Sequence, residues 1–157
     1  MSEAPAPLRG PAPLAFTVYG TPIPKGSTKA FVPKGWKRAI VTSDNPRTKP
    51  WQEAVMHAAI EAIASSPPLE GAVFLSLRFY LPRPKSAPRR VTMATKKPDL
   101  DKLVRAVKDG LTRAGVYRDD SQVVGLGARK DFAGWSWDPM GLNGIPRAEV
   151  EIVVQGS

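Results

Sequence analysis

Four aspartates that could bind a cation flank one stretch of this chain. Asp99 and Asp101 stand at its start, and Asp119 and Asp120 follow its end. The stretch between them has the apolar spacing of one helical stripe, at Leu100, Leu103, Val104, Val107 and Leu111. A glycine ends this pattern, and residues 122–132 then have the composition of a strand. We therefore expect Asp99, Asp101 and Asp120 to gather at one end of the helix.

Gathered carboxylates repel each other unless a hard divalent cation with oxygen ligands neutralises them. Such an ion could orient a phosphate, activate a water and stabilise a leaving oxygen. Each aspartate also has a simpler interpretation. Asp99 is placed to cap the helix through its carboxylate, and Asp101 lies near the positive end of the helix dipole. Asp119 and Asp120 suit a turn. Their joint setting, with lysines directly before them and a basic helix face between, favours a site.

The same residues resemble the signature of the RusA family of Holliday-junction resolvases. The chain reads Lys97-Pro98-Asp99-Leu100-Asp101-Lys102-Leu103-Val104-Arg105, then Asp109-Gly110-Leu111, then Asp119-Asp120-Ser121-Gln122-Val123. Upstream, Tyr19-Gly20-Thr21-Pro22-Ile23-Pro24-Lys25-Gly26 is similar to the family's early strand and the turn that follows it. The resemblance covers residues 16 to 154. It departs from the family pattern at Lys102, where asparagine is usual, and at Arg105, where lysine is usual.

The resemblance implies an endonuclease that resolves four-way junctions by paired symmetric nicks, in DNA recombination and repair or in the processing of branched phage DNA. It implies four catalytic residues, Asp99, Asp101, Asp120 and Arg105. The three aspartates would hold Mg²⁺, with Mn²⁺ as a possible substitute, in a homodimer that uses no small-molecule cofactor. Arg105 keeps a positive charge for a phosphate but cannot readily release a proton, so a metal-bound water would replace a lysine acid.

Two other classes of function stay open at this point. A non-catalytic branched-DNA-binding protein would share the charge, but it gains nothing from acids clustered where a phosphate must approach. A metal-dependent nuclease that acts on other nucleic acids would need the acids as well.

The composition favours a polyanionic partner. The chain has 157 residues, a formal charge of +9 and a pI near 10.1, and each phosphate that a basic protein contacts releases counterions. No apolar run approaches ~20 residues, so we expect no membrane. The chain has no cysteine, and its single histidine, His57, excludes a histidine metal site or a Ser-His-Asp triad. Without a visible signal peptide, the cytoplasm of a bacterial or phage-infected bacterial cell is expected.

Two basic segments are candidates for DNA contact. Residues 83–97 hold six basic residues and no acid, and we interpret them as a flexible loop that orders on phosphates. Residues 31–42 place Lys34 among the aromatic residues Phe31 and Trp36. They form either a surface whose rings stack on exposed bases or a hairpin whose aromatic residues cap the core. The residues expected to contact DNA are Lys25, Lys34, Arg89, Arg90, Lys96, Lys97 and Lys102.

The elements that position these residues predict an α+β fold. Residues 1–14 form a disordered leader rich in proline and alanine, and residues 15–157 form one domain. Strands are expected at 15–19, 71–82, 122–132 and 148–153, and the other helix at 46–66. We expect a mixed β-sheet with two main helices packed on one face. Trp135 and Trp137 lie in a loop where they either pack on the protein or touch DNA.

Overall fold

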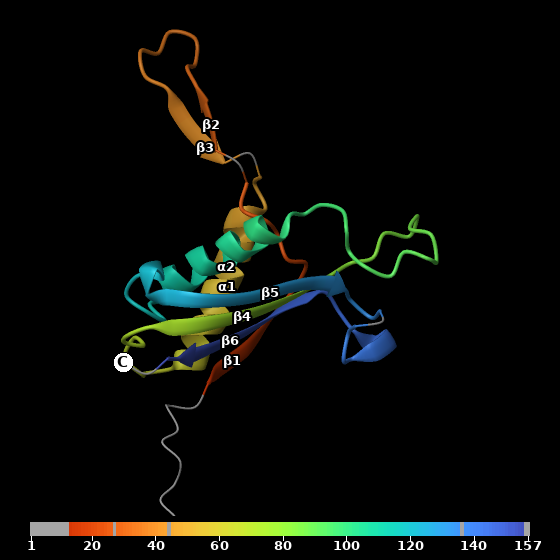
Figure 1. The fold of residues 1–157 in the computed structure, drawn as a ribbon. Helices are drawn as coiled ribbons and strands as arrows, with labels where there is room; N and C mark the ends of the chain where they lie inside the picture. The colour runs from red at the N-terminus through yellow and green to blue at the C-terminus, as the bar shows by residue number, and fades with distance from the viewer. Residues whose placement is uncertain (1–12, 27, 44, 136, 156–157) are drawn as a thin grey trace, which may run out of the picture.

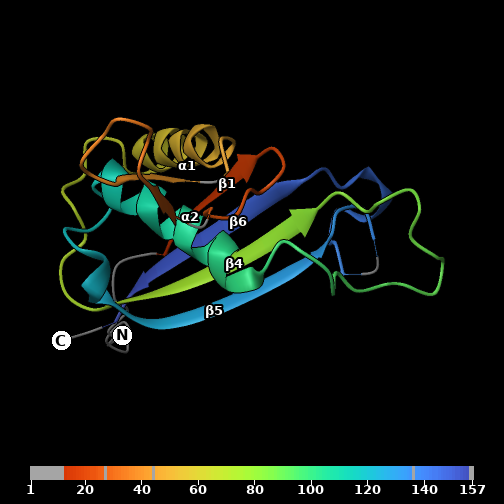
Figure 2. The ribbon, with the colours of Figure 1, turned by 90° about the horizontal axis from the view of Figure 1, so that it is seen from above.

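Two layers form the body of the molecule in the computed structural model, which describes residues 13–26, 28–43, 45–135 and 137–155. A four-stranded sheet carries both α-helices on one face, and a two-stranded hairpin projects from the body (Figures 1 and 2). The elements are β1 (Leu14–Tyr19), β2 (Thr28–Phe31), β3 (Ile40–Ser43), α1 (Thr48–Ile63), β4 (Val73–Leu81), α2 (Leu100–Ala114), the 3₁₀ helix η1 (Asp120–Gln122), β5 (Val123–Phe132), the 3₁₀ helix η2 (Gly141–Asn143) and β6 (Arg147–Val154). The predicted α+β fold with two helices on one face is confirmed.

The main sheet is mixed, with the strand order β1-β6-β4-β5. Strand β4 pairs parallel with β5 and antiparallel with β6, and β1 pairs antiparallel with β6. A parallel pair needs a crossover connection, and α2 supplies it. Helix α2 therefore carries the chain from the end of β4 back to the start of β5.

Alternating side chains of β4 supply the centre of the core. Val73, Leu75, Leu77 and Phe79 are at most 1% exposed, as the strand pattern predicted. The predicted stripe of α2 is also buried, with Leu103, Val107 and Leu111 each at 0% exposure. Helix α1 adds three buried residues, Trp51, Val55 and Ala59. The two helices are thus joined to the sheet by the residues whose spacing indicated a core.

Helices α1 and α2 approach each other closely at Gly110. A Cβ atom added there would lie 2.9 Å from the Val55 Cβ and 3.0 Å from the Gln52 carbonyl oxygen. Glycine at this position therefore allows the two backbones to approach. The second glycine with a defined role is Gly115, which ends α2 in the left-handed region at φ 74°.

Some boundaries differ slightly from those predicted. Leu14 already belongs to β1, while residues 1–12 of the predicted leader lie outside the described residues. Residues 83–97 contain no helix or strand, so the predicted loop is present, and its flexibility stays a prediction. His57 is exposed. Within the described ranges, no helix combines the length and the apolar character that crossing a bilayer requires.

Candidate functional site

The start of α2 presents two exposed carboxylates. Asp99 occupies the N-cap position with an extended backbone (φ −69°, ψ 138°), but its side chain makes no capping hydrogen bond. The interpretation of Asp99 as a cap through its carboxylate is therefore wrong. Asp101 follows in the first turn of α2, and Arg105 lies one turn further on, both with exposed side chains.

A groove of about 350 Å³ contains Asp99. Its lining residues are Pro24, Lys25, Gly26, Asn45, Lys97, Pro98, Asp99 and Lys102. The turn at residues 21–26 is fixed to the starts of both helices: the Lys25 N–H donates to the Lys102 carbonyl at 2.9 Å, and the Thr48 hydroxyl donates to the Pro24 carbonyl at 2.7 Å. Three lysines therefore line the same groove as Asp99: its sequence neighbours Lys97 and Lys102, and Lys25 from a distant part of the chain. This basic lining suits the binding of a phosphate beside the carboxylate.

The Lys25 side chain also fixes the groove to α2. Its Nζ lies 3.0 Å from Oδ2 of Asp109, and Gln52 Nε2 donates to the same oxygen at 3.2 Å. Asp109 therefore holds the turn against both helices.

Lys130 is a contributor that the sequence motifs did not identify. Its Nζ donates to the carbonyl oxygens of Lys96 at 2.7 Å and Pro98 at 2.8 Å, so the end of β5 holds the segment that leads into α2. Lys130 pairs with the buried Phe79 in the sheet register. Side chains of paired residues in parallel strands point to the same face of the sheet, so Lys130 lies on the face that carries the core. A lysine at such a strand position was the signal in the sequence that could have identified it.

The far end of α2 holds the other aspartate pair. Asp119 caps η1 by accepting from the Ser121 N–H at 2.8 Å, and this hydrogen bonding lowers the pKa of Asp119. Gln122 accepts from the Asp119 N–H and donates to the carbonyls of Leu69 and Gly71. Asp119 and Gln122 therefore shape the turn, while Asp120 is exposed beside them.

The expectation that Asp99, Asp101 and Asp120 gather at one end of the helix is wrong for the single chain. Helix α2 has 15 residues, and this length separates its two ends by about 20 Å. Figure 1 shows η1 and the start of β5 at the opposite end of α2 from the basic loop. Among the described residues, no three acidic or histidine side chains are placed to hold one metal ion. One protomer therefore supplies two carboxylates at one end and one at the other.

The basic loop at residues 83–97 presents most of its charge outward. Of its six basic residues, Lys85, Arg89, Arg90, Lys96 and Lys97 are exposed. Arg83 is turned inward instead, with its guanidinium 4.3 Å from the centre of the Trp135 ring and donating to the Pro88 carbonyl at 2.6 Å. The expected DNA contacts of this loop are therefore sterically accessible, and Arg83 is the residue that organises it.

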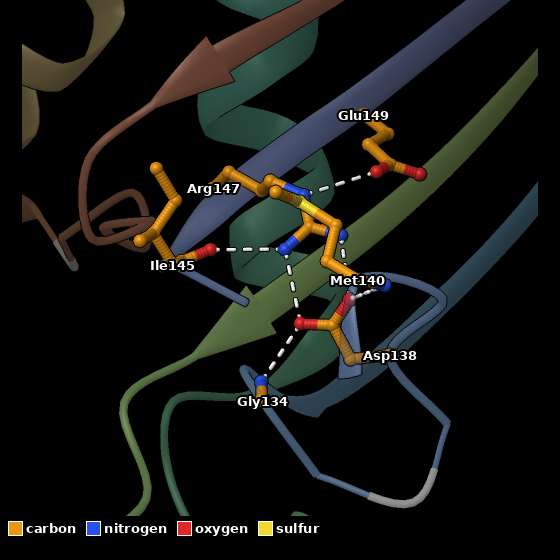
Figure 3. Close-up of polar contacts among 6 residues, drawn as sticks. All are labelled: Gly134, Asp138, Met140, Ile145, Arg147 and Glu149. Carbon is orange, nitrogen blue, oxygen red and sulfur yellow. Dashed lines mark hydrogen bonds and ion pairs between the residues drawn. The ribbon is translucent and has the colours of Figure 1, made fainter. Parts of the chain in front are cut away.

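A buried ion pair organises the loop before β6 (Figure 3). Arg147 donates to both oxygens of Asp138, at 2.8 and 3.0 Å, and Asp138 also accepts from the N–H groups of Gly134 and Met140. These hydrogen bonds, chiefly those from Arg147, lower the pKa of Asp138 to about 2. Trp137 lies against Arg129, 4.6 Å from its guanidinium. Both tryptophans of this loop thus pack on arginines of the protein.

The position of Trp36 in the β2–β3 hairpin bears on the two interpretations of residues 31–42. Trp36 is 61% exposed at its tip and does not cap the core, so that interpretation is wrong for Trp36. Lys34 is exposed beside it. The side chain of Phe31 lies outside the described residues.

Two comparisons with known proteins bear on this site. A family model described as "Endodeoxyribonuclease RusA" matches residues 20–153, which include both ends of α2, the basic loop and the hairpin. A protein of Bacillus subtilis (strain 168) named "Uncharacterized protein YqaN" is 31% identical over 132 residues, which is 76% of this chain and 88% of that protein. The likeness therefore extends well beyond the aspartate motif.

Proposed function

This chain belongs to the RusA family of endodeoxyribonucleases, and we propose on that basis that it cleaves DNA junctions. It is therefore a nuclease whose partner is DNA. The finer proposal is that it resolves four-way (Holliday) junctions by paired symmetric nicks and depends on Mg²⁺. One observation supports this most directly: the Asp99 side chain is exposed and makes no capping hydrogen bond, in a groove that Lys97 and Lys102 also line, and Asp101 follows in the first turn of α2.

The cationic side chains of this region have distinct roles in the proposal. Lys97 and Lys102 bind the phosphates on either side of the cut, because they line the groove that contains Asp99. Arg105 stabilises the charge that develops on the phosphate in the transition state. Since arginine stays protonated, Arg105 acts through its charge and its paired N–H donors, and not as an acid.

The carboxylates of one protomer do not fit a three-ligand metal site, so we place the third carboxylate on a second copy of the chain. In a homodimer whose α2 helices run antiparallel about a two-fold axis, Asp120 of the partner subunit approaches Asp99 and Asp101. A divalent cation held there would supply a water activated for attack. Two such sites in one dimer match the two strands that must be cut in a symmetric junction.

Strand β5 suits the interface of such a dimer. It is an edge strand of the sheet, and it leaves Val124 66% and Leu126 47% exposed. An exposed edge strand with apolar side chains is a template for pairing with another chain. Strand β5 begins close to Asp120, and Lys130 near its other end contacts the segment before α2. Antiparallel pairing of two β5 strands would therefore bring opposite ends of the two α2 helices together.

The experiment compares cleavage of a synthetic four-way junction with cleavage of a linear duplex of the same sequence, in Mg²⁺ or EDTA. We expect paired nicks only on the junction and only with Mg²⁺. Asp101→Asn removes a charge and keeps the side-chain size. It should therefore lower the cleavage rate at least about 100-fold and leave junction binding intact. Glu61→Gln, the same change at an exposed position of α1, should cut at the wild-type rate.

Two outcomes would contradict the proposal in different ways. Equal cutting of duplex and junction would indicate a nuclease for other nucleic acids. Tight junction binding without cutting in Mg²⁺ or Mn²⁺ would indicate a non-catalytic DNA-binding protein. Lys102→Asn and Arg105→Lys, which restore the usual family residues, would then be the variants to test for cleavage.

A further inference from the structure

The β2–β3 hairpin projects from the body beside the start of α2 (Figure 1). Its two strands pair from Thr28 with Ser43 to Phe31 with Ile40, and residues 32–39 form its tip. Both ends of the hairpin join the groove that contains Asp99, because Gly26 before β2 and Asn45 after β3 both line that groove. The hairpin is therefore an arm that extends from the walls of the candidate site.

A tight turn presents Trp36 at the tip of this arm. The Trp36 N–H donates to the Pro33 carbonyl at 2.9 Å, and Gly35 between them has a φ of +86°. This is the geometry of a type II turn, which needs glycine at its third position. The turn fixes the backbone of Trp36 while leaving the side chain 61% exposed.

Trp36 differs from the other three tryptophans of the chain in its surroundings. Trp51 is 5% exposed in the core, Trp135 lies under the Arg83 guanidinium, and Trp137 lies under that of Arg129. Within the described residues, no guanidinium is found over Trp36. An indole displayed in this way has a large apolar face available to a partner.

The charge of the arm indicates what that partner is. Residues 28–43 contain four basic residues, Lys29, Lys34, Lys37 and Arg38, and no acidic residue. Lys34, Lys37 and Arg38 surround Trp36 in the sequence and are exposed. A protein interface would be depleted in lysine at its centre, whereas cations around an aromatic ring match a nucleic acid, which offers phosphates and flat bases together.

The form of the nucleic acid follows from the stacking geometry. Bases inside a continuous duplex stack on each other and leave no face for an indole, whereas a branch point can expose one. From Thr28 to Trp36 the arm covers eight residue steps, which extend over about 25 Å at most. A strand bound in the groove at Asp99 therefore has its neighbouring base pairs within reach of Trp36.

We propose that the β2–β3 hairpin is a stacking arm, in which the Trp36 indole stacks on a base left unpaired at the branch point of the DNA. Lys34, Lys37 and Arg38 bind the phosphates that flank this base. The inference rests on the proposed function for the identity of the DNA, because it assumes a branched substrate. The arm would hold the junction open while the groove positions the strand to be cut.

The test uses Asp101→Asn protein in EDTA, so that no DNA is cut during the measurement. The probe is a four-way junction with 2-aminopurine at the branch point, and the readouts are affinity and 2-aminopurine fluorescence. We expect Trp36→Ala to weaken junction binding about 10- to 100-fold, as measured stacking contributions indicate, and to remove the fluorescence change. Trp36→Phe keeps a ring and should retain most of both. Trp137→Ala, which removes an exposed indole that packs on Arg129, should leave both unchanged.

Three results would overturn the stacking arm. The first is an unchanged fluorescence response in Trp36→Ala. The second is an equal loss of affinity for the junction and for a linear duplex, which would indicate nonspecific binding. The third is a change in oligomeric state of Trp36→Ala in analytical ultracentrifugation, which would place the arm on a second copy of the chain. If the stacking signal is present but wild-type protein does not cut the junction in Mg²⁺, the proposed nuclease specificity fails and the arm stands.

Discussion

At the scale of single residues, the aspartates separate according to what their carboxylates contact. Asp119 caps η1, Asp109 pairs with Lys25, and Asp138 is buried under Arg147. The three aspartates that the family resemblance implies as ligands, Asp99, Asp101 and Asp120, are exposed, and in the part of the chain that the structure describes they form no ion pair. This division supports their assignment to the site.

The Asp138–Arg147 pair predicts a specific stability defect. Asp138→Asn removes the buried counter-charge of the Arg147 guanidinium and leaves only the partly exposed Glu149, and breaking a buried pair in this way costs about 3 kcal/mol or more. We expect urea unfolding at pH 7 to show a loss of this size. Glu149→Gln removes the other ionic partner of Arg147. Because the Glu149 side chain is 34% exposed, this variant should lose clearly less free energy of unfolding than Asp138→Asn.

The same pair predicts how stability depends on pH. The pKa of Asp138 is about 2 in the folded protein against an ordinary value of 3.8, chiefly because Arg147 donates hydrogen bonds to the ionised form. A lowered folded pKa stabilises the fold above the unfolded pKa, and this contribution, about 2 kcal/mol, disappears as the pH falls from about 4 to 2. The stability difference between wild type and Asp138→Asn should shrink over that window. A difference that stays constant with pH would show that the charge of Asp138 is not its cause.

At the scale of elements, the close approach of α1 and α2 determines where the groove lies. Gln52 and Val55 of α1 meet Gly110 of α2, next to the Asp109 carboxylate that holds Lys25. The turn at residues 21–26 is then fixed across the starts of both helices. The glycine of the motif thus has a packing role, and its neighbour Asp109 connects that packing to the groove.

Gly110→Ala should therefore destabilise the protein even though alanine is the better helix former. The new methyl group would lie 2.9 Å from the Val55 side chain, and overpacking of this kind costs about 1–3 kcal/mol, less the roughly 1 kcal/mol that alanine gains in a helix. The Gln52 carbonyl oxygen, a backbone atom, would also lie 3.0 Å from the new carbon, so the upper half of the overpacking range, about 2–3 kcal/mol, applies. We therefore expect a net loss of about 1–2 kcal/mol in urea unfolding. Thr112→Ala on the exposed face of α2 is the control and should change stability by under about 0.5 kcal/mol. Equal stability of Gly110→Ala and wild type would show that the helices separate without cost.

At the scale of the whole molecule, the opposite ends of α2 make the proposed site a property of two chains. A mixing experiment distinguishes this arrangement from a site within one chain. Asp101→Asn and Asp120→Asn proteins are each expected to be inactive. A heterodimer of the two, isolated with different tags, has one site that carries both substitutions and one that carries neither.

The heterodimer should therefore nick one strand of a junction at about half the wild-type rate per dimer. The expected product is a singly nicked junction, which gel electrophoresis separates from paired nicks. Asp99→Asn mixed with Asp101→Asn is the matched control, because both residues lie at the same end of α2, and it should stay inactive. No recovery in the first mixture would contradict a site shared between subunits.

Local patterns in the sequence were sufficient for the two α-helices and the four strands of the main sheet. The apolar period of three to four residues determined α2, and the alternation in residues 71–82 determined β4, because burial of one face requires such a period whatever the partner. The ordered aspartate motif was also sufficient for the family. The contacts of Lys130, Arg83 and Asp138 were not predicted, because their partners lie in other segments or in an irregular loop.

The relative positions of the motif's residues follow from the way the strands pair. Parallel pairing of β4 with β5 requires the connection between them to run back along the sheet, and α2 makes most of this return. The helix therefore separates Asp99 and Asp101 from Asp120, although the motif places them within one short run of sequence. Strand pairing depends on contacts between residues that are far apart in the chain. Local sequence patterns therefore identify the carboxylates, whereas the fold places them at opposite ends of α2.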